Sequence, residues 1–122
     1  MKIISFAWTT PALLASQKTV TRRDWKKAHA LSFHADELVQ AYDRGPRIGG
    51  HQVATIRLTQ DPYLEYSTVI PPLDWFNEGF DYLMNHGITL NGLPALAVWE
   101  GWHTKVRLLW VVRFNLIEIT KK

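Results

Sequence analysis

The pattern of apolar and polar positions predicts six extended segments. Between residues 51 and 58 apolar and polar side chains alternate, which is typical of a strand with one buried face. Residues 107–119 are mostly apolar along their length, which indicates a central strand. The predicted strands are residues 2–8, 19–23, 37–42, 51–58, 66–70 and 107–119.

Helical periodicity and capping residues predict the other elements. Four apolar side chains between Leu73 and Leu83 fall on one stripe, so we expect a single helix over residues 73–85 and another over residues 94–103. Two short helices are expected at residues 12–17, after the hydroxyl cap Thr9-Thr10-Pro11, and at residues 25–31, capped by Asp24. Helices placed among strands without regular alternation predict an α+β fold, a small β-barrel of five to six strands with two to three flanking helices.

Length and missing residue types narrow the kind of protein. A chain of 122 residues predicts one domain spanning 1–122. It has no cysteine, which excludes disulfides and thiolate metal sites, and its five histidines lack metal-ligand spacing. The apolar start is too short for a signal peptide, and no stretch approaches the ~20 apolar residues of a membrane span. We therefore expect a cytoplasmic protein with no metal, cofactor or membrane partner.

The positive charge is concentrated in one short segment. The whole chain carries a net charge of +3, but residues 18–29 alone carry five cations and one anion. The cations are Lys18, Arg22, Arg23, Lys26 and Lys27. A local basic excess favours an anionic partner at that place, whereas a solvated surface face is equally compatible with the charge alone.

Lys18 and Thr21 form a candidate reactive pair within this segment. In an extended chain Thr21 and Arg23 share one face and Arg22 lies on the other. A lysine beside a threonine hydroxyl is a known form of activated nucleophile, and the like charges of Arg22 and Arg23 favour a lowered pKa for Lys18. The simpler interpretation is that threonines suit strands and basic residues suit phosphates, and the residues alone favour it.

Glu78 is the candidate carboxylate. In a continuous helix, Trp75, Glu78 and Tyr82 share a face opposite the apolar stripe, and no cation lies four residues from Glu78. A carboxylate between two aromatic rings suits a cleft in which the rings stack on a base and the carboxylate takes a proton or an amino group. An exposed glutamate beside surface aromatics explains the pattern equally well.

The segment Ala15–Arg23 resembles the signature of the ASCH domain family, which is roughly Gly-x-Lys-x-x-(Glu or Thr)-x-Arg. Lys18, Thr21 and Arg23 match this signature, and Ser16 stands where glycine is usual. The resemblance extends over nearly the whole chain, through Leu38-Val39, Glu78-Gly79-Phe80 and Val111-Val112-Arg113-Phe114. One departure is Ala35-Asp36-Glu37, where the family often has Gly-Asp.

The resemblance implies a PUA-like β-barrel with a cleft for RNA or a nucleotide-type ligand. Small amidohydrolases of this superfamily remove the acyl group from N4-acylated cytidine with a Lys-x-x-Thr pair and a glutamate. By similarity, Thr21 attacks the amide carbonyl, Lys18 activates Thr21, and Glu78 handles the proton of the leaving group.

Two functions therefore stay open. In a binding module for RNA, a nucleoside or a nucleotide, the basic side chains contact phosphates and the aromatic ones stack on bases. The expected ligand-binding residues are Arg22, Arg23, Lys26, Trp75 and Tyr82. In an amidohydrolase, Lys18, Thr21 and Glu78 are catalytic. Threonine at position 21 favours hydrolysis, whereas Lys26 and Lys27 favour a phosphate-bearing ligand.

Overall fold

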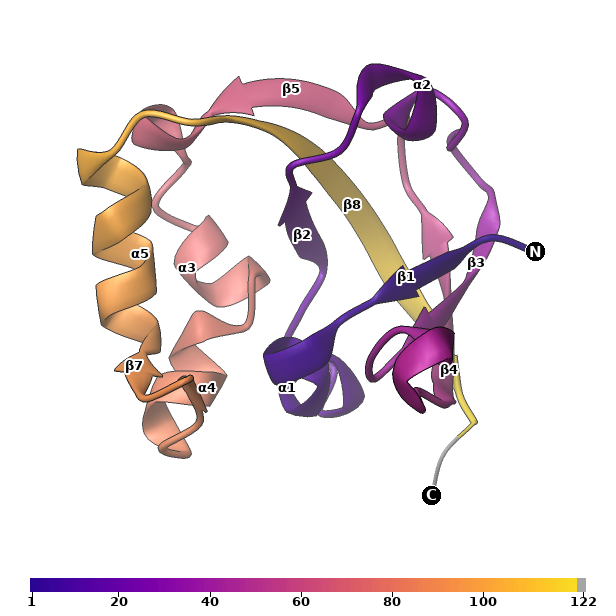
Figure 1. Ribbon diagram of the computed structural model, residues 1–122, viewed down its shortest axis with the longest axis horizontal. Helices are drawn as coiled ribbons and strands as arrows, with labels where there is room; N and C mark the ends of the chain where they lie inside the picture. The colour runs from indigo at the N-terminus through magenta and orange to yellow at the C-terminus, as the bar shows by residue number, and fades with distance from the viewer. Residues whose placement is uncertain (121–122) are drawn as a thin grey trace.

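The computed structural model describes residues 1–120, which form a six-stranded sheet curled into a half-barrel (Figure 1). The strands are β1 (Ile3–Ser5), β2 (Val20–Arg23), β3 (Leu38–Tyr42), β4 (Gln52–Leu58), β5 (Tyr63–Tyr66) and β8 (Leu108–Ile119). Their order is β1-β3-β4-β8-β2, and β5 also pairs with β8. β1 and β2 are therefore the two ends of the curled sheet.

β8 is the strand on which the sheet is assembled. Its second half pairs with β4, with Leu58 opposite Phe114. Its first half has a neighbour on each edge, so that Val111 lies opposite Arg22 of β2 and also opposite Tyr63 of β5. The long apolar run predicted this central position, because a strand with neighbours on both edges and packing on both faces has few exposed positions.

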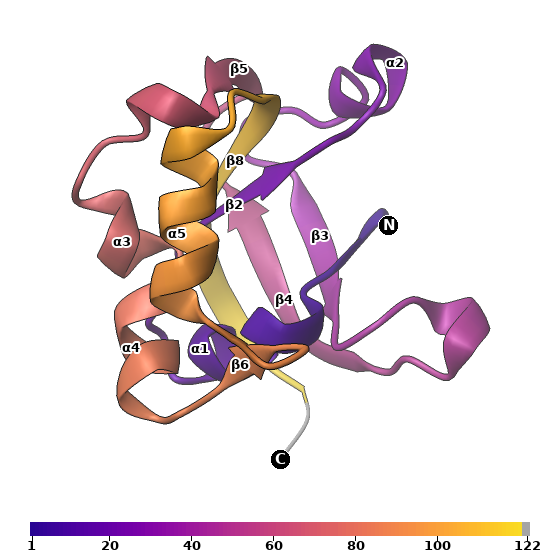
Figure 2. The same cartoon turned by 60° about the vertical axis from the view of Figure 1, so that its left-hand side comes forward.

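The described residues contain five α-helices. They are α1 (Thr10–Leu14), α2 (Lys27–Ala30), α3 (Asp74–Asn77), α4 (Phe80–Asn85) and α5 (Ala95–Thr104), and a small hairpin of β6 (Thr89–Leu90) and β7 (Leu93–Pro94) precedes α5. α3, α4 and α5 form a layer beside the sheet, whereas α2 lies away from this helical layer (Figures 1 and 2). The α+β class is confirmed, with more helices than expected. No helix in this part of the chain is long and apolar enough to cross a membrane.

Two apolar cores hold these layers. The barrel interior collects side chains from β1, β3, β4 and β8, with Phe6 packed edge to face on Phe114 at 5.6 Å between ring centres. The second core lies between α1, α4 and α5 around Phe80, whose ring centre is 5.6 Å from that of Trp8 and 5.2 Å from that of Trp102. Four of the six tryptophans, Trp8, Trp75, Trp99 and Trp102, pack in or against this second core.

A left-handed glycine breaks the helix predicted over residues 73–85. Gly79 has a φ of +84° and separates α3 from α4. A Cβ at this position would lie 2.5 Å from the Cβ of Ala12 and 3.3 Å from that of Lys18, so α1 packs directly against the turn. The prediction of one helix is wrong because an apolar stripe can continue across a turn that reorients the backbone.

Other local predictions also need correction. The strand expected at residues 66–70 is wrong except at Tyr66, where β5 ends. Ser67–Val69 form a 3-10 helix, because the N–H of Ser67 donates to the carbonyl of Arg107 just before β8. Neither predicted helix cap operates. The Thr9 hydroxyl donates to the carbonyl of Phe6, and Lys26 instead of Asp24 precedes α2.

We predict that Gly79→Ala destabilises the fold more than Gly87→Ala. Both glycines have positive φ, so each alanine costs about 1–2 kcal/mol of backbone strain. A Cβ at Gly79 also meets Ala12, which adds about 1–3 kcal/mol, whereas a Cβ at Gly87 has nothing within 4 Å. Urea unfolding of the two variants measures the difference. Equal losses would contradict the close packing of α1 on this turn.

Candidate functional site

Lys18 is buried although it opens a basic stretch of sequence. The turn before it has Ser16 at a φ of +60°, the left-handed conformation that glycine adopts most easily, at the position where the ASCH signature has glycine. Lys18 is 1% exposed, and its Nζ donates to the main-chain oxygen and to Oε1 of Glu78, both at 2.9 Å. Lys18 thus ties the segment after α1 to the turn between α3 and α4.

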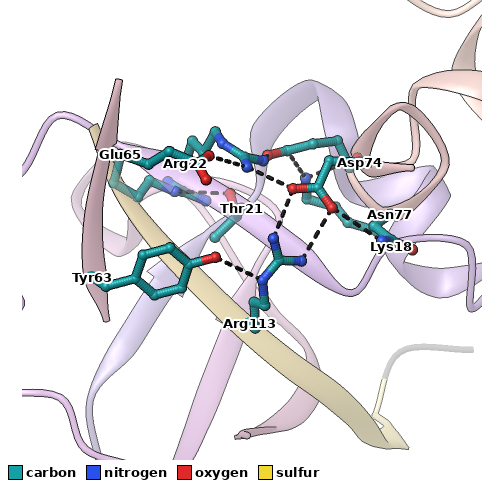
Figure 3. A network of polar contacts seen from close by, with 10 residues as sticks. Lys18, Thr21, Arg22, Tyr63, Glu65, Asp74, Asn77 and Arg113 are labelled. Carbon is teal, nitrogen blue, oxygen red and sulfur yellow. Dashed lines mark hydrogen bonds and ion pairs between the residues drawn. The ribbon is translucent and has the colours of Figure 1, made fainter. Parts of the chain in front are cut away.

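Arg22 is bound by three carboxylates from distant parts of the chain (Figure 3). Its Nη1 donates to Glu78 Oε2 at 2.7 Å. Its Nη2 donates to Asp74 Oδ2 at 2.6 Å and to Glu65 Oε1 at 2.7 Å. The Arg22 side chain is 1% exposed. The guanidinium is therefore committed to the protein and is not free to contact a phosphate.

Asp74 completes the network from the start of α3. Its carboxylate accepts two hydrogen bonds from Arg113, at 3.1 and 2.8 Å, besides the one from Arg22. Asn77 donates to the same carboxylate at 3.0 Å, and Nε of Arg113 donates to the hydroxyl of Tyr63 at 3.0 Å. The network therefore joins β2, β5 and β8 to the α3–α4 segment.

This network pairs two of the five cations that the sequence concentrates in residues 18–29, which are Lys18 and Arg22. Three cations face three carboxylates, which are Lys18, Arg22 and Arg113 against Glu65, Asp74 and Glu78. Buried charges are tolerated when they are paired and hydrogen-bonded in this way. The local basic excess is thus partly a structural feature and not a surface for an anionic partner.

Burial and pairing shift the pKa values of Lys18, Arg23 and Asp74. Burial lowers the pKa of Lys18 below its usual value, against the opposing attraction and hydrogen bond of Glu78. Burial also lowers the pKa of Arg23 to about 10. For Asp74, burial raises the pKa, but the hydrogen bonds from Arg113 and Arg22 outweigh it and hold the pKa below its ordinary value. Lys18 is consequently easier to deprotonate than a surface lysine.

A pocket of about 240 Å³ opens along the free edges of β1 and β2, against the helical layer. One part of its lining is polar and contains Ser5, Thr9, Thr21, Arg22, Arg23 and Glu78. The other part is apolar and contains Phe6, Ala7, Trp8, Phe80, Leu90, Val98 and Trp102. Polar groups and aromatic rings thus share a single small cavity.

Thr21 and Arg23 project from β2 into this pocket. The Thr21 hydroxyl oxygen accepts a hydrogen bond from Nε of Arg23 at 3.1 Å. The Arg23 guanidinium lies 5.4 Å from the centre of the Phe6 ring, which also holds it in place. The hydroxyl proton of Thr21 has no acceptor in the described part of the chain, so it is available to a ligand.

The pocket continues into a second, shallower hollow of about 520 Å³. The two hollows share Leu90, Val98 and Trp102 in their linings, so they adjoin beside α5, and the second hollow is called the groove below. The far end of the groove carries two cations, Lys105 and Arg107. Within residues 1–120 no three His, Cys, Asp or Glu side chains are grouped to hold a metal ion.

The structure brings together five of the predicted site residues and leaves three apart. Thr21, Arg22, Arg23 and Glu78 line the pocket, and Lys18 lies behind Glu78.

Lys26 is exposed beside α2 and does not line the pocket. Trp75 donates to Asp81 within the helical layer, and Tyr82 stacks on His86 at 4.0 Å. The face predicted for Trp75, Glu78 and Tyr82 is wrong, because the helix breaks at Gly79 and Glu78 is buried.

Sequence reasoning missed the partners of the basic segment and the aromatic lining. Glu65 and Asp74 carry no local signal, since they lie 43 and 52 residues from the arginine that they bind. A signal did exist for Arg113, which is a charged residue directly after the apolar run of residues 108–112. Such a residue needs a buried counter-charge.

We predict that Asp74 makes the fold sensitive to acid. Its folded pKa lies below the unfolded value of about 3.9, so its contribution to stability is complete above about pH 5 and is lost as the pH falls through the folded pKa. Asp74→Asn should lower the free energy of unfolding by about 3 kcal/mol or more at pH 7, because it leaves buried cations without a counter-charge. It should also flatten the acid slope, which is the fall of that free energy as the pH is lowered.

Urea unfolding between pH 7 and pH 3 measures both effects. Asp24→Asn is the matched control, since this carboxylate is 77% exposed and lies 3.4 Å from Arg107. Its stability and acid slope should stay near those of the wild type. An unchanged acid slope in Asp74→Asn would remove Asp74 from the account of acid sensitivity.

Comparisons with known proteins support the fold. No protein-family model matches the chain, and no curated protein matches it. Among solved structures, the chain is similar to a protein from Enterococcus faecalis described as EF3133, family-model DUF984. The TM-score is 0.55, with 14% sequence identity, over 99% of this chain and 82% of that chain. The two chains share the α+β half-barrel architecture.

Proposed function

We propose that this chain is an ASCH-type protein that binds a nucleoside unit, free or as part of a nucleotide or RNA, in the pocket between β1 and β2. The observation that carries the proposal is the composition of the pocket, in which aromatic rings and hydrogen-bonding groups line one cavity of about 240 Å³. Drug-sized ligands occupy pockets of roughly 300–1,000 Å³, so this one suits a smaller ligand.

The lining matches the two properties of a nucleobase. A base is flat and stacks on aromatic rings, here those of the half-buried Trp8 and Trp102. Its edge carries donors and acceptors, which are matched by the Thr21 hydroxyl and the Arg23 guanidinium. Trp8 and Trp102 take the stacking role that sequence analysis gave to Trp75 and Tyr82.

The adjoining groove supports a ligand that carries a phosphate. It leads from the pocket to Lys105 and Arg107, which are exposed and cationic. A phosphate attached to a nucleoside in the pocket meets these cations, and not Arg22, whose guanidinium is enclosed by carboxylates. The buried Lys18 and the left-handed Ser16 support the ASCH assignment, because both occupy signature positions.

We predict that cytidine and cytidine monophosphate bind to the purified protein and that Trp102→Leu weakens both interactions. Loss of one stacking ring should cost about 1–3 kcal/mol of binding free energy, which is roughly tenfold or more in Kd. Isothermal titration calorimetry measures the affinities. Tyr66→Leu is the control, since this aromatic is 55% exposed and lines neither hollow. Equal weakening by both variants would show that the nucleoside does not bind in this pocket.

Amide hydrolysis is a second candidate function, and one observation favours it. Thr21 and Glu78 line the same pocket, while Lys18, whose pKa is lowered by burial, bonds to Glu78 from behind. This is a nucleophile beside a coupled acid–base pair.

The reaction on an N4-acylated cytidine balances in two steps. Thr21 Oγ bonds to the acyl carbon while its proton passes to the Lys18–Glu78 pair. The bond between the acyl carbon and N4 then breaks, N4 takes that proton, and cytidine leaves. Water next adds to the Thr21 ester, which releases the carboxylic acid and restores the hydroxyl.

We predict that the wild-type protein deacetylates N4-acetylcytidine and that Thr21→Val abolishes turnover, because valine keeps the shape of threonine without its hydroxyl. Chromatographic detection of cytidine measures the rate. Thr19→Val is the matched control, since Thr19 is exposed two residues away and lies outside the pocket. If Thr21→Val turns over as fast as Thr19→Val, or if no variant releases cytidine, hydrolysis is excluded and binding stands alone.

A further inference from the structure

The main chain of β1 has a free side that faces the open seam of the half-barrel. Two hydrogen bonds show which residues of the β1 segment direct their main-chain groups toward β3. The Gln40 N–H donates to the carbonyl of Lys2, and the Phe6 N–H donates to the carbonyl of Tyr42. In a parallel pair, alternate residues point their main-chain groups at the neighbouring strand. Residues 2, 4 and 6 therefore bond to β3, and Ser5 directs its N–H and C=O away from β3.

The main chain of β2 has a free side of the same kind. The Phe114 N–H donates to the carbonyl of Thr19, so Thr19 and Phe114 are a hydrogen-bonded pair in the register of β2 with β8. Hydrogen-bonded positions alternate along an antiparallel pair, so Thr21 also bonds to β8. The N–H and C=O of Arg22 consequently point away from β8, toward the free edge.

These two free main-chain edges meet at one cavity. Ser5 and Arg22 line the same pocket, and within residues 1–120 β1 and β2 do not pair with each other. The guanidinium of Arg22 is already bonded to carboxylates, so its main chain supplies the uncommitted polar groups at this edge. An unpaired strand edge is a template for any group that offers a donor beside an acceptor.

We propose that the ligand's ring inserts between β1 and β2 and that the main chains of Ser5 and Arg22 recognise its hydrogen-bonding edge, as a neighbouring strand would. The proposal rests on the proposed nucleoside function and narrows the ligand class. The ring must carry a hydrogen-bond donor next to an acceptor, as an amide does. Cytosine and uracil meet this requirement, and N4-acylated cytosine keeps it. A flat aromatic ring without such an edge does not.

Proline substitution tests the main-chain donor directly. Ser5→Pro removes an N–H that makes no bond to β3, and proline is tolerated at such edge positions. Ile3→Pro is the matched control, because the N–H of Ile3 also points away from β3 and Ile3 lies outside the pocket. Ser5→Ala removes the hydroxyl alone.

We expect Ser5→Pro to bind cytidine about tenfold more weakly than Ser5→Ala, the usual effect of losing one well-formed hydrogen bond, and Ile3→Pro to bind like the wild type. Equal affinity of Ser5→Pro and Ser5→Ala would overturn the proposal.

A ligand series gives the same answer without a variant that has to fold. The probe is the ribonucleoside of difluorotoluene, which has the shape of a pyrimidine nucleoside without strong hydrogen-bonding groups on its ring. Titration calorimetry with the wild-type protein should show binding at least about tenfold weaker than that of cytidine. Equal affinities would overturn the main-chain recognition and leave the stacking pocket intact. Absence of binding by both nucleosides would overturn the proposed function and this inference together.

Discussion

The hydrogen bonds that Glu78 accepts from Lys18 and Arg22 hold the helical layer against the half-barrel. Each oxygen of this carboxylate takes one cation, at 2.9 and 2.7 Å, and the main-chain oxygen of Glu78 takes a second bond from Lys18. All three side chains are nearly inaccessible to water, so loss of one leaves a buried charge without its partner. The opposite walls of the pocket, β2 and the α3–α4 turn, are therefore fixed relative to each other.

The same network decides what the basic segment contributes to a ligand. The side chain of Arg22 pairs with three carboxylates, whereas its main-chain N–H and C=O lie at a free strand edge. Thr21 and Arg23, on the other face of β2, supply the pocket with a hydroxyl and a cation. One strand thus provides structural pairing from one face and ligand contacts from the other face and the edge. Two of the five cations in residues 18–29, Lys18 and Arg22, are thus balanced within the protein and need no anionic partner.

The sequence predicted those features that depend on neighbouring residues. β4 and β8 were found because their periodicity is local, and Lys18, Thr21 and Glu78 were singled out by spacing and by the ASCH resemblance. The ion pairs were not, because they join residues 39 to 60 positions apart. The break at Gly79 was missed since the apolar stripe runs on through it, and this error placed Glu78 between the wrong aromatic side chains. Residues from four separate segments form the apolar lining, and no one-dimensional pattern joins them.

The most direct test is a crystal structure of the protein with cytidine bound. The account predicts that the base lies between β1 and β2, stacked on the aromatic lining and bonded to the main chain of Arg22, while the Arg22 guanidinium keeps its contacts with Glu65, Asp74 and Glu78. A base bound beside α2, or an Arg22 side chain that leaves its carboxylates to contact the ligand, would contradict it.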